Sequence, residues 1–199
     1  MAREYSFMRF CNGEDIIEVS LERKVRKTGF AGLVCSKQFG ETIVIFVDEN
    51  HLDERCIRGG YITARKDGTA PCIILDTATF NGIKRGEVAA RFLLMHEVGH
   101  YCCGHLVDPP LLDDECSCRK ACMEKNEVSP KELEADCFAA EYIGAVNAKW
   151  ALQETMEQRM TRDFLFGVEM EPESKIALRE FQLRIESVNE RFGLSEEDE

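Results

Sequence analysis

The sequence predicts an α+β protein, with a small mixed or antiparallel sheet packed on two helices and a helical C-terminal part. Short runs rich in β-branched residues, which favour strands, occupy much of the segment between residues 30 and 77. After Asn81-Gly82 the apolar residues instead recur every three to four positions, the period of an amphipathic helix. A chain of 199 residues is long enough for one domain with a substantial core, or for one domain with a helical appendage.

The predicted strands lie where short apolar runs are bounded by turn residues: residues 43–47, 61–64 and 72–75. An Asp67-Gly68 turn signal lies between the last two runs, so we expect these two strands to form a hairpin. Residues 32–35 are a candidate for a further strand. The segment 14–27 mixes polar and apolar residues and is predicted to include a short helix.

The clearest helical pattern extends from about residue 85 to residue 103. One face of this helix collects residues at helical spacing: Ala89, Phe92, Leu93, His96, Gly99, His100 and Cys103. Gly104 is a suitable C-terminal stop, and Pro109-Pro110 prevents the helix from continuing much further.

A second helix is predicted from Ser129 to about Gly144. Ser129 is a suitable N-cap, Pro130 suits the first helical position, and Glu132 at the third position completes a capping box. Two more helices are predicted near residues 148–160 and 174–192. The acidic end of the chain, residues 194–199, is predicted to be disordered.

The formal net charge of −12 argues against direct nucleic-acid binding through the general field of the protein. No apolar run approaches the roughly 18 residues that a membrane helix needs, and the N-terminus lacks the features of a signal peptide. We therefore expect a cytoplasmic protein. Its ten cysteines are then expected to be free thiols, and a second metal or redox site within Cys102–Cys122 is the alternative.

The segment His96-Glu97-Val98-Gly99-His100 matches the pattern H-E-x-x-H and lies in the middle of the first long helix. Two histidines four positions apart share a helix face and can bind one metal ion together. Zinc lowers the pKa of a bound water to about 7, so a mild base such as the carboxylate of Glu97 can take its proton. The pattern therefore predicts zinc as the cofactor, His96 and His100 as ligands, and Glu97 as the catalytic base.

A catalytic zinc site usually has three protein ligands and one open position. His105 follows His100 by five residues rather than the six of the metzincin arrangement, so it does not fit as the third ligand. Glu132 and Asp136 share a face of the second helix that is otherwise small and apolar, where buried acids need partners. We expect Glu132 on the metal and Asp136 on the second ring nitrogen of a ligating histidine. The alternative for Glu132 is the capping box alone, and Glu134 is the fallback ligand, although it points away from that face.

Three further residues are candidates for contact with the substrate or with a transition-state oxyanion: His105, Tyr101 and Tyr142. For His105 the alternative is a residue at the helix end that meets the helix dipole. Nothing in the sequence separates the two tyrosines.

Two segments of the chain resemble the ImmA/IrrE family of metallopeptidases. Residues 90–101, around the H-E-x-x-H pattern, resemble its active-site helix, and residues 132–141 resemble its third-ligand helix. The resemblance covers roughly residues 44–144 and includes the strand that ends at residue 76. Asp136 stands where the family often has Asn, and Tyr142-Ile143-Gly144 replaces the usual Leu-Met-Pro.

The resemblance implies a small sheet with helices and a zinc ion bound by His96, His100 and Glu132, with Glu97 as the base. It also implies regulated cleavage of a partner protein. In this family the partner is a DNA-binding repressor with a helix-turn-helix.

These observations together predict a zinc metallopeptidase, an endopeptidase that acts on a protein partner. The strand of residues 72–76 is a candidate to bind the substrate in extended form by edge addition. The predicted organisation is a zincin-like metallopeptidase domain over residues 1–145 with C-terminal helices over residues 146–193 packed on it. The alternative is a non-catalytic zinc-stabilised interaction module or redox-sensing regulator that uses the Cys102–Cys122 loop, and the intact Glu97 argues against it. A toxin or phage-borne protein with the same chemistry is a third hypothesis, and the sequence leaves the oligomeric state open.

Overall fold

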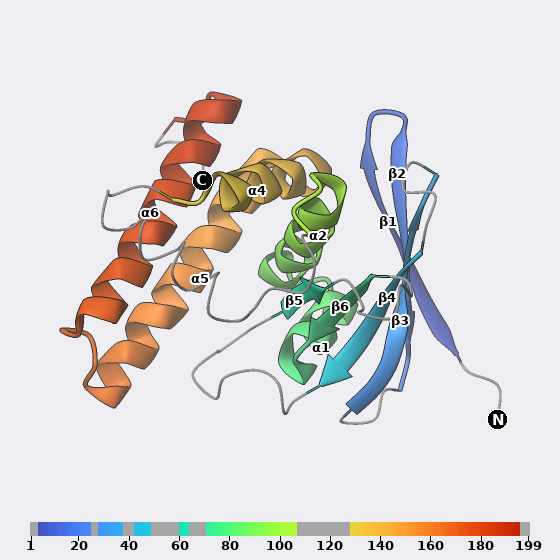
Figure 1. Ribbon diagram of the computed structural model, residues 1–199, viewed down its shortest axis with the longest axis horizontal. Helices are drawn as coiled ribbons and strands as arrows, with labels where there is room; N and C mark the ends of the chain where they lie inside the picture. The colour runs from blue at the N-terminus through green and yellow to red at the C-terminus, as the bar shows by residue number, and fades with distance from the viewer. Residues whose placement is uncertain are drawn as a thin grey trace.

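The computed structural model describes residues 4–24, 28–37, 42–48, 60–63, 71–106 and 128–195. Several predicted features lie outside these residues: the Asp67-Gly68 turn, most of the cysteine-rich loop before Val128, and residues 196–199 of the predicted disordered tail. The described part of the chain contains one six-stranded mixed sheet and five helices (Figure 1). The predicted α+β class and the mixed sheet are therefore confirmed.

The sheet has the strand order β1-β2-β3-β4-β6-β5. Its strands are β1 (Tyr5–Asn12), β2 (Asp15–Glu22), β3 (Thr28–Ser36), β4 (Thr42–Asp48), β5 (Gly60–Thr63) and β6 (Cys72–Leu75). The first four strands are antiparallel to their neighbours, whereas β6 is parallel to β4 and antiparallel to β5. All four predicted strands are confirmed, and so is the antiparallel pairing of β5 with β6.

A hairpin of β1 and β2 occupies the N-terminal part of the chain, so the short helix predicted over residues 14–27 is wrong. In β2 the residues Ile17, Val19 and Leu21 are buried, while polar residues stand between them. This period of two places one face of the strand on the core, and it is the signal that the helix prediction overlooked. Gly13, with a φ of 60°, provides the left-handed conformation that the tight connection between the strands needs.

Strand β6 lies inside the sheet, paired with β4 on one side and with β5 on the other. The backbone groups of β6 are therefore committed on both edges, and the prediction that a substrate adds to the strand of residues 72–76 is wrong. Among the described strands, β5 is the outermost at this end of the sheet, and it contacts the helix that contains the H-E-x-x-H pattern.

The helices of the described residues are α1 (Thr77–Arg85), α2 (Val88–Cys102), α4 (Pro130–Ile143), α5 (Ala145–Phe166) and α6 (Pro172–Phe192). The helices predicted near residues 85, 129, 148 and 174 correspond to α2, α4, α5 and α6. The sequence pattern did not predict α1, which Asp76 caps by accepting a 2.5 Å hydrogen bond from the Thr79 N–H. Gly86, with a φ of 85°, ends α1 and separates it from α2.

A cluster of buried apolar side chains joins the sheet to the helices. It includes Val19, Ile45 and Ile73 from the strands, Phe80 and Leu94 from α1 and α2, and Ala148, Leu152 and Val188 from α5 and α6. Helix α4 packs on α2, α5 contacts both of them, and α6 packs on α4 and α5 (Figure 1). Helix α6 is thus far from the sheet but lies directly beside α4, so its side chains can reach the residues of α4.

The predicted end of the first domain, residue 145, is the first residue of α5. Leu194, within the predicted tail, packs against the core. Within the described part of the chain, no helix combines the length and the apolar character needed to cross a membrane.

The contact between α2 and α4 depends on a glycine. A Cβ atom on Gly99 would lie 3.1 Å from the Cα and carbonyl oxygen of Ala135 and 3.1 Å from Cβ of Phe138. Such distances are too short for a relaxed contact, and two of the three atoms belong to the α4 backbone, which cannot turn away as a side chain can. The small residues on the inner face of α4 therefore allow a close approach at Gly99.

The variant Gly99→Ala should separate α2 from α4. Alanine favours helix by about 1 kcal/mol over glycine, but overpacking of this contact should cost about 1–3 kcal/mol, so we expect a net loss of stability. Because the displaced backbone lies next to Asp136, affinity for a divalent metal ion should fall as well. Urea denaturation and zinc titration measure the two effects, with the exposed Lys131→Ala as the control. A more stable Gly99→Ala protein would contradict the close contact.

Candidate metal centre

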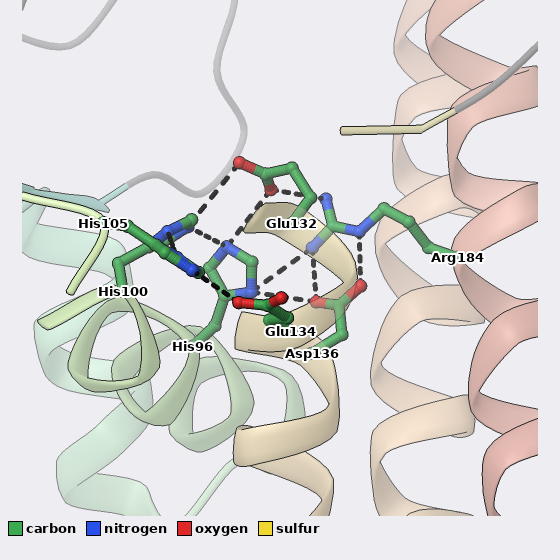
Figure 2. Close-up of polar contacts among 7 residues, drawn as sticks. All are labelled: His96, His100, His105, Glu132, Glu134, Asp136 and Arg184. Carbon is green, nitrogen blue, oxygen red and sulfur yellow. Dashed lines mark hydrogen bonds and ion pairs between the residues drawn. The ribbon is translucent and has the colours of Figure 1, made fainter. Parts of the chain in front are cut away.

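Helix α2 places the two histidines of the H-E-x-x-H pattern one turn apart, beside α4 (Figure 2). The Nε2 atoms of His96 and His100 lie 3.0 Å apart, and His96 is buried. Residues four apart differ by only about 40° around a helix of 3.6 residues per turn. Both rings can therefore direct a nitrogen to the same point.

The first turn of α4 brings Glu132 to the two imidazole rings. Its Oε2 atom lies 3.3 Å from Nε2 of His96, and its Oε1 atom lies 3.5 Å from Nε2 of His100. Ser129 makes no side-chain hydrogen bond at the start of α4, so its half of the predicted capping box is not formed. The Glu132 carboxylate instead lies against the two imidazole rings.

The donor atoms of His96, His100 and Glu132 all lie within 4.8 Å of one another and could hold a metal ion. Nitrogen and oxygen ligands bind zinc at about 2.0–2.2 Å, which places neighbouring donors about 3.3–3.6 Å apart in a tetrahedron. The two imidazole nitrogens lie 3.0 Å apart, and each lies 3.3 or 3.5 Å from a different oxygen of Glu132, so the separations are close to this spacing. These residues therefore fit an ion of this kind, bound by two nitrogens and one carboxylate.

The second ring nitrogen of His96 is held by Asp136, which lies one turn after Glu132 on α4. His96 Nδ1 is 2.8 Å from Oδ1 of Asp136, and the carboxylate is buried. A carboxylate only accepts, so His96 Nδ1–H is the donor and Nε2 is the atom that faces the metal position. Asp136 thus lies where the helix spacing predicts it.

Arg184, on α6, is a member of the site that the sequence analysis did not identify. Its Nε and Nη2 atoms donate to the two oxygens of Asp136 at 2.7 and 2.6 Å, a bidentate pair (Figure 2). Its Nη1 atom lies 3.6 Å from Oε2 of Glu132. The guanidinium therefore contacts both a candidate ligand and the residue that orients another.

A signal for Arg184 was present in the sequence. Phe181, Ile185 and Val188 form the apolar stripe of α6, and Arg184 falls on the same stripe at i+3 from Phe181. A cation in the middle of a buried stripe needs an anion from another element. The sequence predicts Asp136 as a buried acid. The pairing of Asp136 with Arg184, 48 residues later on another helix, could not be predicted from the apolar pattern of either helix.

His100 is held by a different chain of hydrogen bonds. Its Nδ1 atom lies 2.9 Å from Nδ1 of His105, and Nε2 of His105 lies 2.9 Å from Oε2 of Glu134 (Figure 2). Glu134 accepts from His105 Nε2–H, so His105 Nδ1 accepts from His100 Nδ1–H. Nε2 of His100 is then the atom available to a metal ion.

Both ring nitrogens of His105 are engaged in this series of hydrogen bonds. Its backbone N–H also donates to the carbonyl of His100 at the end of α2, so the residue does close the helix end. Glu134 is exposed, as predicted, but it bonds to His105 rather than pointing freely into solvent.

The remaining candidates lie around the triad or away from it. Glu97 follows His96 on α2 and is only 6% exposed. Tyr142 lies in the hydrophobic core, where its ring packs on Phe138 with centroids 4.8 Å apart. Tyr101 is partly buried against the same core. Glu97 is thus a buried residue that directly follows His96 on α2, and the ring of Tyr142 packs in the core.

The carboxylates around His96 change its ionisation. Burial alone would lower the pKa of His96, but hydrogen bonds and charges from Asp136 and Glu132 raise it to about 10. Burial and the neighbouring His96 lower the pKa of His100 to about 4. The pKa of Glu132 stays well below its usual value because His96 and Arg184 outweigh the effect of its burial. In the metal-free protein near pH 7, one proton therefore occupies the position between the ligands.

The first prediction from this geometry tests whether Arg184 supports zinc binding through Asp136 or directly through Glu132. Arg184→Met should lower the free energy of unfolding by about 3–5 kcal/mol, because it leaves the Asp136 carboxylate buried without its cation. It should also weaken zinc binding by roughly 10- to 100-fold, the usual cost of losing such orienting partners. If Arg184 acts through Asp136, adding Arg184→Met to Asp136→Asn should bring little further loss of zinc affinity.

Zinc titration and denaturation of the two single variants and the double variant measure this coupling. Lys175→Met, exposed on the same helix, is the control. Equal losses of zinc affinity in both backgrounds would show instead that Arg184 acts directly on Glu132.

The second prediction is that zinc binding releases a proton and therefore depends on pH. Since His96 is protonated below a pKa of about 10 and His100 is neutral above about 4, zinc must displace about one proton between these limits. Affinity for zinc should therefore rise roughly tenfold per pH unit across this range. Calorimetry at pH 7 in buffers of different ionisation enthalpy counts the released protons. Binding without proton release would show that His96 is already neutral in the metal-free protein.

Comparison with known proteins identifies no relative. No protein-family model, curated protein or solved structure matches the chain. The resemblance to the ImmA/IrrE family therefore rests on the two segments around His96 and Glu132, and a function has to be proposed from the chemistry of the site itself.

Proposed function

We propose that the chain is a zinc-dependent endopeptidase that cleaves a protein partner. The observation that supports this most directly is the convergence of His96, His100 and Glu132, with Glu97 buried next to the first ligand in the chain. Two neutral imidazoles and one carboxylate are the donor set of catalytic zinc sites in peptidases, which keep one position open. A purely structural zinc site usually fills all four positions with protein ligands.

Different residues of the chain would have different roles in hydrolysis. Bound zinc would supply a Lewis acid that lowers the pKa of a water molecule to about 7. Glu97 would accept the proton of that water and deliver it to the leaving amine nitrogen as the peptide bond breaks. Asp136 and Arg184 would hold His96 in position, and His105 and Glu134 would hold His100.

The sheet offers a place for an extended substrate. β5 is the outermost strand beside β6 among those described, and it contacts α2. A peptide segment that adds to β5 would extend the sheet next to the helix that contains His96 and Glu97. This assignment replaces the strand of residues 72–76, whose edges are both paired.

The resemblance to the ImmA/IrrE family suggests a helix-turn-helix repressor as the partner. The net charge of −12 favours a basic partner, and proteins that bind DNA carry positive charge on the surface that contacts the phosphates. We therefore place the protein in the cytoplasm as a regulator that acts on a DNA-binding protein by cleavage.

The alternative is a non-catalytic, zinc-stabilised module that senses thiol oxidation. Desolvation by surrounding atoms, with a smaller effect of Cys103, raises the pKa of Cys102 to about 12, and burial likewise raises the pKa of Cys103. Redox sensors need a thiolate near pH 7, so these two thiols are poor sensors. Three more cysteines of that segment, Cys116, Cys118 and Cys122, lie outside the described residues.

Two variants test the proposal. Glu97→Gln should keep zinc and fold but lower cleavage of a peptide library by at least about 100-fold, because the base is removed and the ligands remain. Glu132→Ala should lose both zinc and cleavage. Zinc content by metal analysis and cleavage by mass spectrometry are the two readouts, with the exposed Glu190→Gln as the control. Near wild-type cleavage by Glu97→Gln would remove its role as base, and zinc binding without any cleavage would favour the non-catalytic module.

A further inference from the structure

A second group of three metal-binding side chains lies next to the first: Cys103, His105 and Glu134. Their donor atoms lie within 4.8 Å of one another, and they come from the end of α2, the residues that follow it, and the first turns of α4. The His105 ring is only 8% exposed and is fixed by hydrogen bonds at both nitrogens. Cys103 and Glu134 are exposed, so their side chains can move toward an ion at little cost.

We propose that Cys103, His105 and Glu134 bind a second zinc ion, and that this ion weakens metal binding at His96, His100 and Glu132. A thiolate, an imidazole and a carboxylate favour zinc over hard cations such as Mg²⁺ or Ca²⁺, which prefer oxygen ligands alone. The binding of the second ion rests on these three residues. Its inhibitory effect on cleavage rests on the proposed function as well.

The two sites are coupled through the hydrogen bond between His100 and His105. When Nε2 of His100 binds a metal, its proton is on Nδ1 and donates to Nδ1 of His105 over 2.9 Å. His105 must then accept at Nδ1 and carry its own proton on Nε2, where it donates to Glu134 over 2.9 Å. Both hydrogen bonds, from His100 to His105 and from His105 to Glu134, form only when the protons occupy these positions.

A metal ion on Nε2 of His105 reverses the arrangement. The proton of His105 must then move to Nδ1, where it would face the Nδ1–H of His100 across the same 2.9 Å. Two N–H groups repel each other at this distance, and the hydrogen bond that orients His100 is lost. The second ion and the His100 ligation therefore oppose each other, and the coupling is mutual.

The coupling predicts that cleavage activity first rises and then falls as the concentration of free zinc increases. At low concentration zinc fills the triad of His96, His100 and Glu132. At higher concentration it fills the second site, and the loss of the His100–His105 hydrogen bond should weaken the first site roughly tenfold. Cleavage should then fall as free zinc rises further.

Metal titration of the full chain tests the site without an activity assay. Metal-free wild type should bind about two Co²⁺ ions, with a near-ultraviolet charge-transfer band that reports thiolate ligation by the second ion. Cys103→Ser should bind about one ion and lose the band. Cys102→Ser, the neighbouring exposed thiol outside the group, should keep both. Glu134→Gln, whose amide oxygen can still accept from His105, should weaken the second ion.

Three results would overturn the inference. They are a wild type that binds a single ion, a thiolate band that survives Cys103→Ser, and a second ion that leaves the affinity of the first unchanged. In the cleavage assay, Cys103→Ser should reach the same maximum as wild type but show no decline at high zinc. A protein that binds two coupled ions yet cleaves no peptide would support the second site and reject the peptidase.

Discussion

The bidentate pair between Arg184 and Asp136 is the interaction on which the arrangement of the site depends. Both side chains are almost fully buried, so each charge is acceptable only because the other is present. The pair joins α6 to α4, and Asp136 then joins α4 to His96 on α2. Three helices from distant parts of the chain are thereby fixed relative to one another, and the position of the metal ligands follows from that.

Helix geometry explains why one pair can position several ligands. Glu132 and Asp136 are one turn apart on α4, so a contact that fixes Asp136 also fixes the direction of Glu132. His96 and His100 are one turn apart on α2, and the Gly99–Ala135 contact sets how closely the two helices approach. The candidate ligands therefore come from two rigid elements rather than from loops, and their donor atoms converge on one point.

The parts of the site that lie within one helix could be predicted from the sequence, and the contacts between distant elements could not. His96, His100, Glu132 and Asp136 follow from helical spacing and from the cost of burying acids on a small, apolar face. The pairing of Arg184 with Asp136 depends on how α6 packs, which no local pattern reports. The hydrogen bond from His100 to His105 depends on the turn after α2. The strand β2 was predictable in principle, because Ile17, Val19 and Leu21 alternate with polar residues at the period of a strand.

The two candidate histidine ligands are held by different hydrogen-bond partners. Those of His96 are buried, whereas those of His100 lead to the protein surface. His96 is held by a buried carboxylate with its own cation, and both side chains are almost fully buried. His100 is held by the imidazole of His105, which in turn bonds to the exposed carboxylate of Glu134. Any ligand that competes for His105 or Glu134 therefore acts on His100 first. In the proposed regulation, a small cation would therefore act on the candidate ligand His100, while the buried groups around His96 would keep that candidate ligand in position.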